Sequence, residues 1–232
     1  SHNWGGFYAL DIYNNEVRQY LKEVFDTVLN VWGYDMVKLD FLYACCIIPF
    51  NGKSRGEIMC DAMDLIRELC GDKLILGCGV PLAPAFGKVD FCRIGADMAL
   101  SWDKKPFSRE DVSTKHALLN TIFRRELDGR AFLNDPDVFL LRDNNIKMSF
   151  EQRKLIAETA SLFGNLLFVS DDVSTYNNNQ KDCFINFTTR NKADINYVNM
   201  DSDGDISIKY TLDGEKKGYC FNINSGDKKV LI

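Results

Sequence analysis

Ten consecutive residues decide the fold, and they read Trp32-Gly33-Tyr34-Asp35-Met36-Val37-Lys38-Leu39-Asp40-Phe41. In a β-strand the side chains alternate, so Val37, Leu39 and Phe41 would face one way, and Lys38 and Asp40 the other. Burying a carboxylate and an ammonium group in a sheet is costly unless they pair or line a cavity that holds a polar ligand. The stretch therefore predicts either a structural ion pair at a strand end or one wall of a polar site.

Stretches with helical and strand periodicity alternate around this run. Apolar residues recur at helical spacing over residues 15–30 and 58–70, and an apolar strand pattern follows at 73–76. The alternation continues with strands at 89–94, 130–134 and 166–169 and helices at 108–127 and 150–162. This order is typical of parallel strands covered by helices. Residues 1–182 therefore predict part of a (β/α)8 TIM barrel, with about five of eight strands, as though the chain began after the third.

The pattern changes after residue 182. Short alternating runs separated by turn clusters occupy residues 184–189, 193–198, 206–212 and 217–223. We expect a small antiparallel β domain over residues 183–232. Asp201, Asp203 and Asp205 have the first offsets of a calcium loop, but Ile206 stands where that loop needs glycine and no glutamate follows at the required distance. A hairpin turn is the better interpretation.

The overall composition argues against two classes of partner. The 232 residues carry a net charge of -5, and their Lys and Arg residues are scattered rather than gathered in a basic stripe. No apolar run approaches the length of a bilayer span. We therefore expect neither a nucleic acid nor a membrane as a partner.

The cysteines could indicate disulfides, a zinc site or reduced thiols. The eight cysteines stand at positions 45, 46, 60, 70, 78, 92, 183 and 220. They form no Cys-x-x-Cys motif, the chain has only two histidines, and most of the cysteines lie in apolar patterns. We expect reduced, buried thiols in a cytoplasmic protein, with no metal and no cofactor.

A second charged cluster follows the predicted strand at 89–94. Arg93 and Asp97 flank Gly95, two strand–helix units after Asp40. Two carboxylates at strand ends, each near a cation, are the groups needed for double-displacement glycoside hydrolysis. Lys38 would keep Asp40 ionised as the nucleophile, whereas Asp97 would need a less charged pocket, or the charge of Asp40, to hold its proton. Spacing alone leaves this as one arrangement among several.

Five segments in unbroken order resemble the α-galactosidases of glycoside hydrolase family 36. They are Phe7–Asp11, Trp32–Tyr34 with Lys38–Leu42, Leu76–Leu82, Arg93–Asp97 and Leu133–Asp137. The resemblance spans roughly residues 4–176. It implies a retaining enzyme that releases terminal α-linked galactose from oligosaccharides, with Asp40 as nucleophile and Asp97 as acid/base. It also implies that Lys38, Cys78 and Arg93 line the galactose pocket.

The chain departs from the family pattern at several places. Ala96 stands where proline is usual, so the loop before Asp97 loses a restraint on φ. Cys45 and Cys46 replace small residues and could narrow the leaving-group side. Asn134 and Asp137 match a strand-end motif that we interpret as mainly structural.

The family's N-terminal β domain and three further barrel strands have no counterpart in this chain. We therefore expect a fragment of a longer enzyme, inactive by itself, whose partner is another copy or the remainder of the longer chain. Two alternatives stay open. One is α-N-acetylgalactosaminidase or galactosyl-transfer activity in the same family, and the other is a non-catalytic carbohydrate-binding or assembly fragment.

Overall fold

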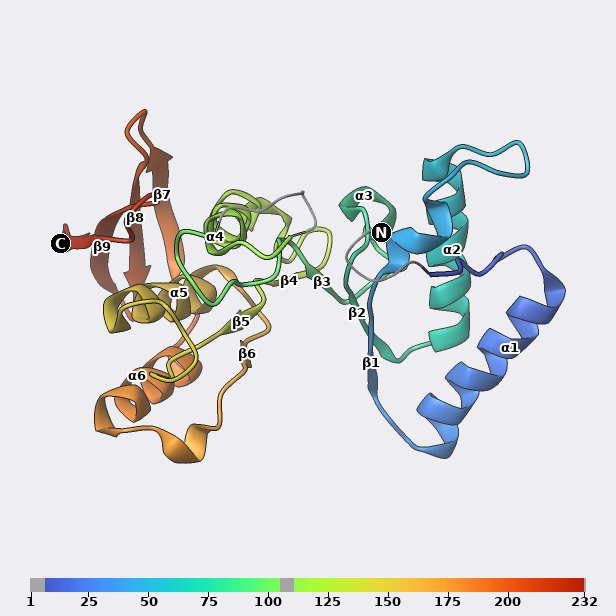
Figure 1. Cartoon of the computed structure of the whole chain (residues 1–232), viewed down its shortest axis with the longest axis horizontal. Coiled ribbons are helices and arrows are strands. Elements are labelled where there is room, and N and C mark those ends of the chain that lie inside the picture. The colour runs from blue at the N-terminus through green and yellow to red at the C-terminus, as the bar shows by residue number, and fades with distance from the viewer. Residues whose placement is uncertain (1–6, 105–110, 232) are drawn as a thin grey trace. The chain divides into compact units, whose positions relative to one another are not determined.

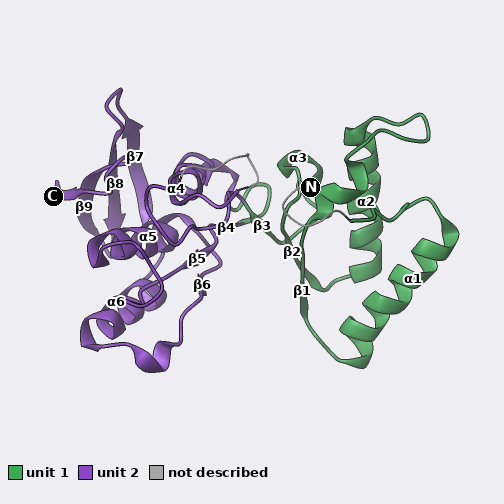
Figure 2. Ribbon diagram, in the orientation of Figure 1, with its two compact units in different colours: residues 1–93, 129–133 green, residues 94–128, 134–232 purple. Residues whose placement is uncertain are grey.

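The computed structural model describes residues 7–104 and 111–231 (Figure 1). The chain divides into two compact units, which Figure 2 shows in separate colours. Unit 1 comprises residues 1–93 and 129–133, and unit 2 comprises residues 94–128 and 134–232. The chain thus leaves unit 1, returns to it for one short segment and leaves it again.

Unit 1 alternates strands and helices. In chain order it contains α1 (Asn15–Asp26), η2 (Thr27–Val31), β1 (Met36–Leu39), η3 (Leu42–Cys46), α2 (Arg55–Cys70), β2 (Leu74–Gly77), α3 (Leu82–Ala85) and β3 (Phe91–Arg93). Local sequence sets the helix starts. The Asn14 side chain accepts from the N–H of Glu16 before α1, and Ser54 and Glu57 form a reciprocal capping box at α2.

The strands of unit 1 pair in parallel and in sequence order. Leu39 of β1 lies opposite Gly77 of β2, which lies opposite Cys92 of β3. The sheet order is β1-β2-β3-β4, where β4 is Leu133–Asp135 and only its first residue belongs to unit 1. β1 is the edge strand, because among the described residues no strand pairs with its other side.

Unit 2 combines the later helices and parallel strands with an antiparallel sheet. Besides the rest of β4 it contains α4 (Thr114–Phe123), η4 (Arg125–Leu127), β5 (Val138–Phe139), α5 (Phe150–Phe163), β6 (Phe168–Val169), η5 (Val173–Thr175), α6 (Asn178–Thr189), β7 (Asp194–Met200), β8 (Asp205–Leu212), β9 (Glu215–Asn222) and β10 (Lys228–Val230). β5 and β6 pair in parallel, and the antiparallel order is β10-β9-β8-β7. One buried cluster joins Leu155 and Phe163 of α5 to Ile208 and Phe221 of this sheet.

Residues 184–189, which the sequence predicts as the first strand of the β domain, are helical instead. They form the second half of α6, which begins with a capping box between Asn177 and Gln180. Phe184 and Phe187 lie one helical turn apart; Phe187 belongs to the core of unit 2, and the partly buried Phe184 packs against it. Over so short a run their spacing fits a helix as well as a strand. The capping box at the start of α6 favours the helix. The domain boundary at residue 183 remains a prediction.

The helix predicted over residues 108–127 is shorter than expected. α4 begins after Ser113, whose hydroxyl accepts from the N–H of His116, and it ends at Phe123 before the single turn of η4. Residues 108–110 lie outside the described residues. In the described part of the chain, no helix is both long and apolar enough to cross a membrane.

Candidate active site

Asp40 follows β1 directly and starts a tight turn. Its side chain is exposed, and Phe41 after it has a φ of 55°, a left-handed conformation that is uncommon for a bulky residue. The N–H of Phe41 donates to Oδ1 of Asp40 over 2.7 Å. The turn therefore fixes one carboxylate oxygen through a strained backbone, and such strain tends to cluster at functional sites.

Gly79 allows the ends of β1 and β2 to come together behind this carboxylate. The N–H of Tyr43 donates to the Gly79 carbonyl oxygen over 2.8 Å, and Gly79 has a φ of 57°. A Cβ at this position would lie 3.0 Å from the backbone nitrogen of Phe41 and 3.2 Å from Oδ1 of Asp40. Glycine is therefore required both for its backbone conformation and for the close approach. The sequence hinted at this only through Gly77 and Gly79 on either side of Cys78.

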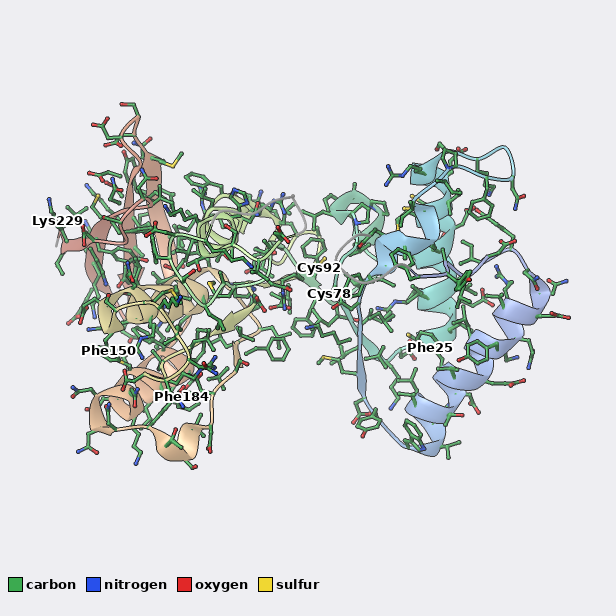
Figure 3. All side chains as sticks on the ribbon, viewed as in Figure 1. Phe25, Cys78, Cys92, Phe150, Phe184 and Lys229 are labelled. Atoms are coloured by element: carbon green, nitrogen blue, oxygen red, sulfur yellow. The ribbon has the colours of Figure 1, made fainter. Side chains whose placement is uncertain are left out.

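Three of the predicted site residues stand at equivalent positions on adjacent parallel strands: Asp40, Cys78 and Arg93. Each directly follows the last residue of its strand that lies opposite a residue of the neighbouring strand. Figure 3 labels Cys78, which follows β2. The side chains of Cys78 and Arg93 are buried, with 6% and 8% of their surface exposed. The carboxyl ends of parallel strands are where barrels of this kind place their active sites.

The pKa of the Cys78 thiol is influenced by all three charged residues predicted in unit 1, namely Lys38, Asp40 and Arg93. Burial raises the pKa of Cys78 to about 12, and the hydrogen bond and charge of Asp40 act in the same direction, whereas Arg93 and Lys38 act against it. Cys78 is therefore a neutral S–H donor at ordinary pH rather than a nucleophile. Four of the five predicted site residues, Lys38, Asp40, Cys78 and Arg93, are thus brought together in unit 1.

A hollow of about 600 Å³ runs along the free edge of β1. The hollow is lined by residues from both faces of the strand, with Lys38 and Asp40 on one face and Leu39 and Phe41 on the other. Residues from both faces can line the same hollow only where it runs along an unpaired edge of the strand. The opposite walls are apolar and come from residues 7–10 and Ile12, from α1 and from α2.

Asp97, the fifth predicted residue, lies in unit 2, four residues after the end of β3. Its side chain is exposed, and its carbonyl oxygen accepts from the N–H of Ser113 over 2.9 Å. Ser113 is the N-cap of α4, so the segment that carries Asp97 is attached to the start of that helix. The distance between Asp97 and Asp40 remains a prediction.

Asp137, in the connection between β4 and β5, shapes the same segment. Its carboxylate accepts from the N–H of Met98 over 2.6 Å, and its own N–H donates to Asp135 over 2.8 Å. Asp137 and Asp135 are 5% and 0% exposed, and Asp137 has a φ of 81°. These contacts give Asp137 a structural role beside Asp97.

Within the described ranges, no three His, Cys, Asp or Glu residues gather in a way that could hold an ion. The eight cysteines, all of which fall in these ranges, are free thiols.

Comparison with known proteins shows which solved structures share this fold. No protein-family model matches the chain. An α-galactosidase from Thermus thermophilus in complex with p-nitrophenyl α-D-galactopyranoside matches with a TM-score of 0.75 and 28% identity, over 92% of this chain and 43% of that one. The same enzyme in complex with stachyose matches with a TM-score of 0.71 and 32% identity, over 82% of this chain and 42% of that one.

A third structure agrees in fold at lower identity. α-Galactosidase I from Mortierella vinacea has a TM-score of 0.64 and 14% identity, over 88% of this chain and 56% of that one. The chain therefore spans less than half of the Thermus chains that it matches. The predicted fold class, a barrel portion followed by a small antiparallel β domain, is confirmed, and the chain has an α-galactosidase-like fold.

Proposed function

We propose that this chain is the part of a retaining α-galactosidase of glycoside hydrolase family 36 that carries both catalytic carboxylates. The observation that carries the proposal is the row of Asp40, Cys78 and Arg93 at the ends of three adjacent parallel strands, with Lys38 on the same hollow as Asp40. The names of the Thermus thermophilus and Mortierella vinacea neighbours support a substrate with an α-linked galactosyl group. Stachyose in one of these complexes supports an oligosaccharide substrate.

In this proposal Asp40 attacks the anomeric carbon while Asp97 gives its proton to the departing glycosidic oxygen. The covalent galactosyl ester on Asp40 is then hydrolysed by a water molecule that Asp97, now ionised, deprotonates. Two inversions at the same carbon retain the α configuration. The retaining route requires the two carboxyl groups to lie about 5–6 Å apart.

The other residues of the pocket hold the sugar and the nucleophile. Lys38 and Arg93 supply positive charge and N–H donors for galactose hydroxyls, while the protonated Cys78 thiol donates to Asp40. The free thiols favour a reducing compartment, so a cytoplasmic location is part of the proposal.

Covalent trapping tests the assignment of both carboxylates. The natural polypeptide that contains this chain would be treated with 5-fluoro-α-galactosyl fluoride, whose leaving group needs no proton. We expect the label on Asp40, in the tryptic peptide of residues 39–53. Asp40→Asn should take up no label, whereas Asp97→Ala should still be labelled and should lose most of its activity on oligosaccharides. A label on another peptide would contradict the role of Asp40 as nucleophile. If Asp97→Ala lost reactivity equally toward the galactosyl fluoride and toward oligosaccharides, Asp97 would not be the acid/base.

A further inference from the structure

The peptide unit that follows the candidate acid/base is held at both of its ends. Asp97 supplies the carbonyl oxygen of this unit, and Met98 supplies its N–H. The carbonyl oxygen accepts from the N–H of Ser113 over 2.9 Å, and the N–H donates to Oδ2 of Asp137 over 2.6 Å. Because a peptide unit is planar, two contacts at opposite ends fix its orientation and with it the direction of the chain at Asp97.

The first of these contacts comes from the start of α4, which is itself fixed. Ser113 and Thr114 are 2% and 0% exposed. The Thr114 hydroxyl lies within hydrogen-bond distance of the carbonyl oxygens of Ala99 and Ser101, at 3.3 and 3.0 Å. The segment after Asp97 is therefore attached to the beginning of α4 at three carbonyl groups, all within unit 2.

The second contact comes from the connection between β4 and β5, which is equally restricted. Asp137 is 5% exposed and has a φ of 81°, and its N–H donates to Asp135 over 2.8 Å. Pro136 lies so close to Gly164, the C-cap of α5, that a Cβ on Gly164 would lie 2.7 Å from its ring carbons. A left-handed conformation at a residue other than glycine persists only where the surroundings determine it, and such strain clusters at functional sites.

The residue before Asp97 adds little restraint of its own. Ala96 does not limit φ in the way that proline would, and the Asp97 side chain is exposed. A general acid must lie within hydrogen-bond reach of the oxygen that it protonates, and a displacement of 1 Å can cost on the order of 100-fold in rate. The position of the Asp97 carboxyl group therefore depends on the peptide unit that follows it.

We propose that Asp137 is a positioning residue for the acid/base, acting on Asp97 through the N–H of Met98. This inference rests on the proposed retaining glycosidase function. It assigns Asp137 to one part of the reaction, the transfer of a proton between Asp97 and the glycosidic oxygen. Loss of the contact should therefore slow the cleavage of bonds whose leaving group needs that proton, and spare bonds whose leaving group does not.

The test compares Asp137→Gly with Asp137→Asn in the natural polypeptide that contains this chain. Glycine adopts the left-handed φ without strain and removes the acceptor, whereas asparagine tolerates the same φ and keeps an acceptor oxygen. The measured quantity is kcat/KM, which reports formation of the galactosyl ester, on stachyose and on α-galactosyl fluoride. We expect Asp137→Gly to lose about 100-fold on stachyose but less than about threefold on the fluoride. Asp137→Asn should stay within about fivefold of the wild type on both.

Asp90→Ala is the matched control. Asp90 precedes β3, whereas Asp97 follows it, and its carboxylate also accepts from a backbone N–H, that of Ile75, over 2.8 Å. This variant should change both kcat/KM values by the same factor, whatever it costs in stability. Equal fractional losses on the two substrates in Asp137→Gly, or the same losses in Asp137→Asn, would overturn the proposal.

Hydrogen exchange separates this inference from the proposed function. Without its acceptor, the Met98 N–H should exchange at least about tenfold faster in Asp137→Gly than in the wild type, while Asp137→Asn and Asp90→Ala should stay close to the wild type. Unchanged exchange in Asp137→Gly would overturn the contact itself, whatever reaction the protein catalyses. Faster exchange together with a wild type that hydrolyses neither substrate would refute the proposed function and leave Asp137 with a structural role only.

Discussion

At the scale of single residues, Gly79 controls how the candidate nucleophile is held. Gly79→Ala should cost about 1–2 kcal/mol of stability through its left-handed backbone. It should also displace Asp40 and Phe41, because the new Cβ would lie 3.2 Å from the carboxylate. We expect a fall in kcat for galactoside hydrolysis by the natural polypeptide that is larger than any rise in KM.

Gly71 offers a matched control for this substitution. It has a φ of 55°, and nothing lies within 4 Å of where its Cβ would be. Gly71→Ala should therefore lose similar stability in urea unfolding and keep its activity. If both variants lose activity equally, Gly79 acts only through stability.

Buried thiols should make the fold sensitive to alkali. Burial raises the pKa of Cys70 from the ordinary 9.0 to about 11. Since the unfolded chain ionises first, the stability that this thiol contributes is complete below pH 9 and is lost as the pH rises toward 11. The destabilisation caused by Cys70→Ala, measured by urea unfolding, should therefore be smaller at pH 10 than at pH 7.5. A pH-independent effect of Cys70→Ala would contradict the prediction.

At the scale of elements, an ion pair ties the last strand of unit 2 to a helix. Lys228 of β10 pairs with Glu158 of α5, and their side chains are 21% and 10% exposed. Lys228 also lies 4.3 Å from the ring centre of Tyr219, and Arg190 donates to the Glu158 carbonyl oxygen over 2.8 Å. Glu158→Ala should lower the free energy of unfolding by about 3 kcal/mol, because it leaves Lys228 largely buried without its partner.

An exposed pair on the same sheet provides the comparison. Glu215 and Lys217 lie 3.1 Å apart with 74% and 40% of their side chains exposed. Glu215→Ala should change the stability by at most about 0.5 kcal/mol. Equal effects at Glu158 and Glu215 in chemical denaturation would show that the buried pair contributes no special stability.

The elements also show what could be predicted from the sequence. Apolar periodicity and helix caps were enough for β1, α2 and α5, because these segments contain an unambiguous period or a capping box. The same signals failed at α6, because the spacing of Phe184 and Phe187 fits the periodicity of a helix as well as that of a strand. Parallel pairing explains why Asp40 and Cys78 meet, once each is recognised as ending a strand. The left-handed turn at Phe41 depends on the approach of two strand ends, which no local pattern records.

At the scale of the whole molecule, the free edge of β1 bears on activity. The hollow beside Asp40 is open along this edge, so water and substrate are not confined on that side. We expect the isolated chain to show no appreciable hydrolysis of an aryl α-galactoside, and to associate with another copy unless the remainder of a longer chain covers the edge. Light scattering coupled to an activity assay would decide, and robust turnover by a 26.5 kDa monomer would refute the prediction.

The return of the chain to unit 1 for residues 129–133 limits how such a protein can be recombined. In that segment the N–H of Leu133 donates to the carbonyl oxygen of Asp90 over 2.8 Å, and the carbonyl oxygen of Ala131 accepts from Gly87 over 3.4 Å. A gene cut once after residue 93 would separate these partners and leave the sheet of unit 1 with a second unpaired edge, at β3. Genetic exchange with a homologue would therefore preserve both units only through several simultaneous crossovers, so the two units should be inherited together rather than shuffled as modules.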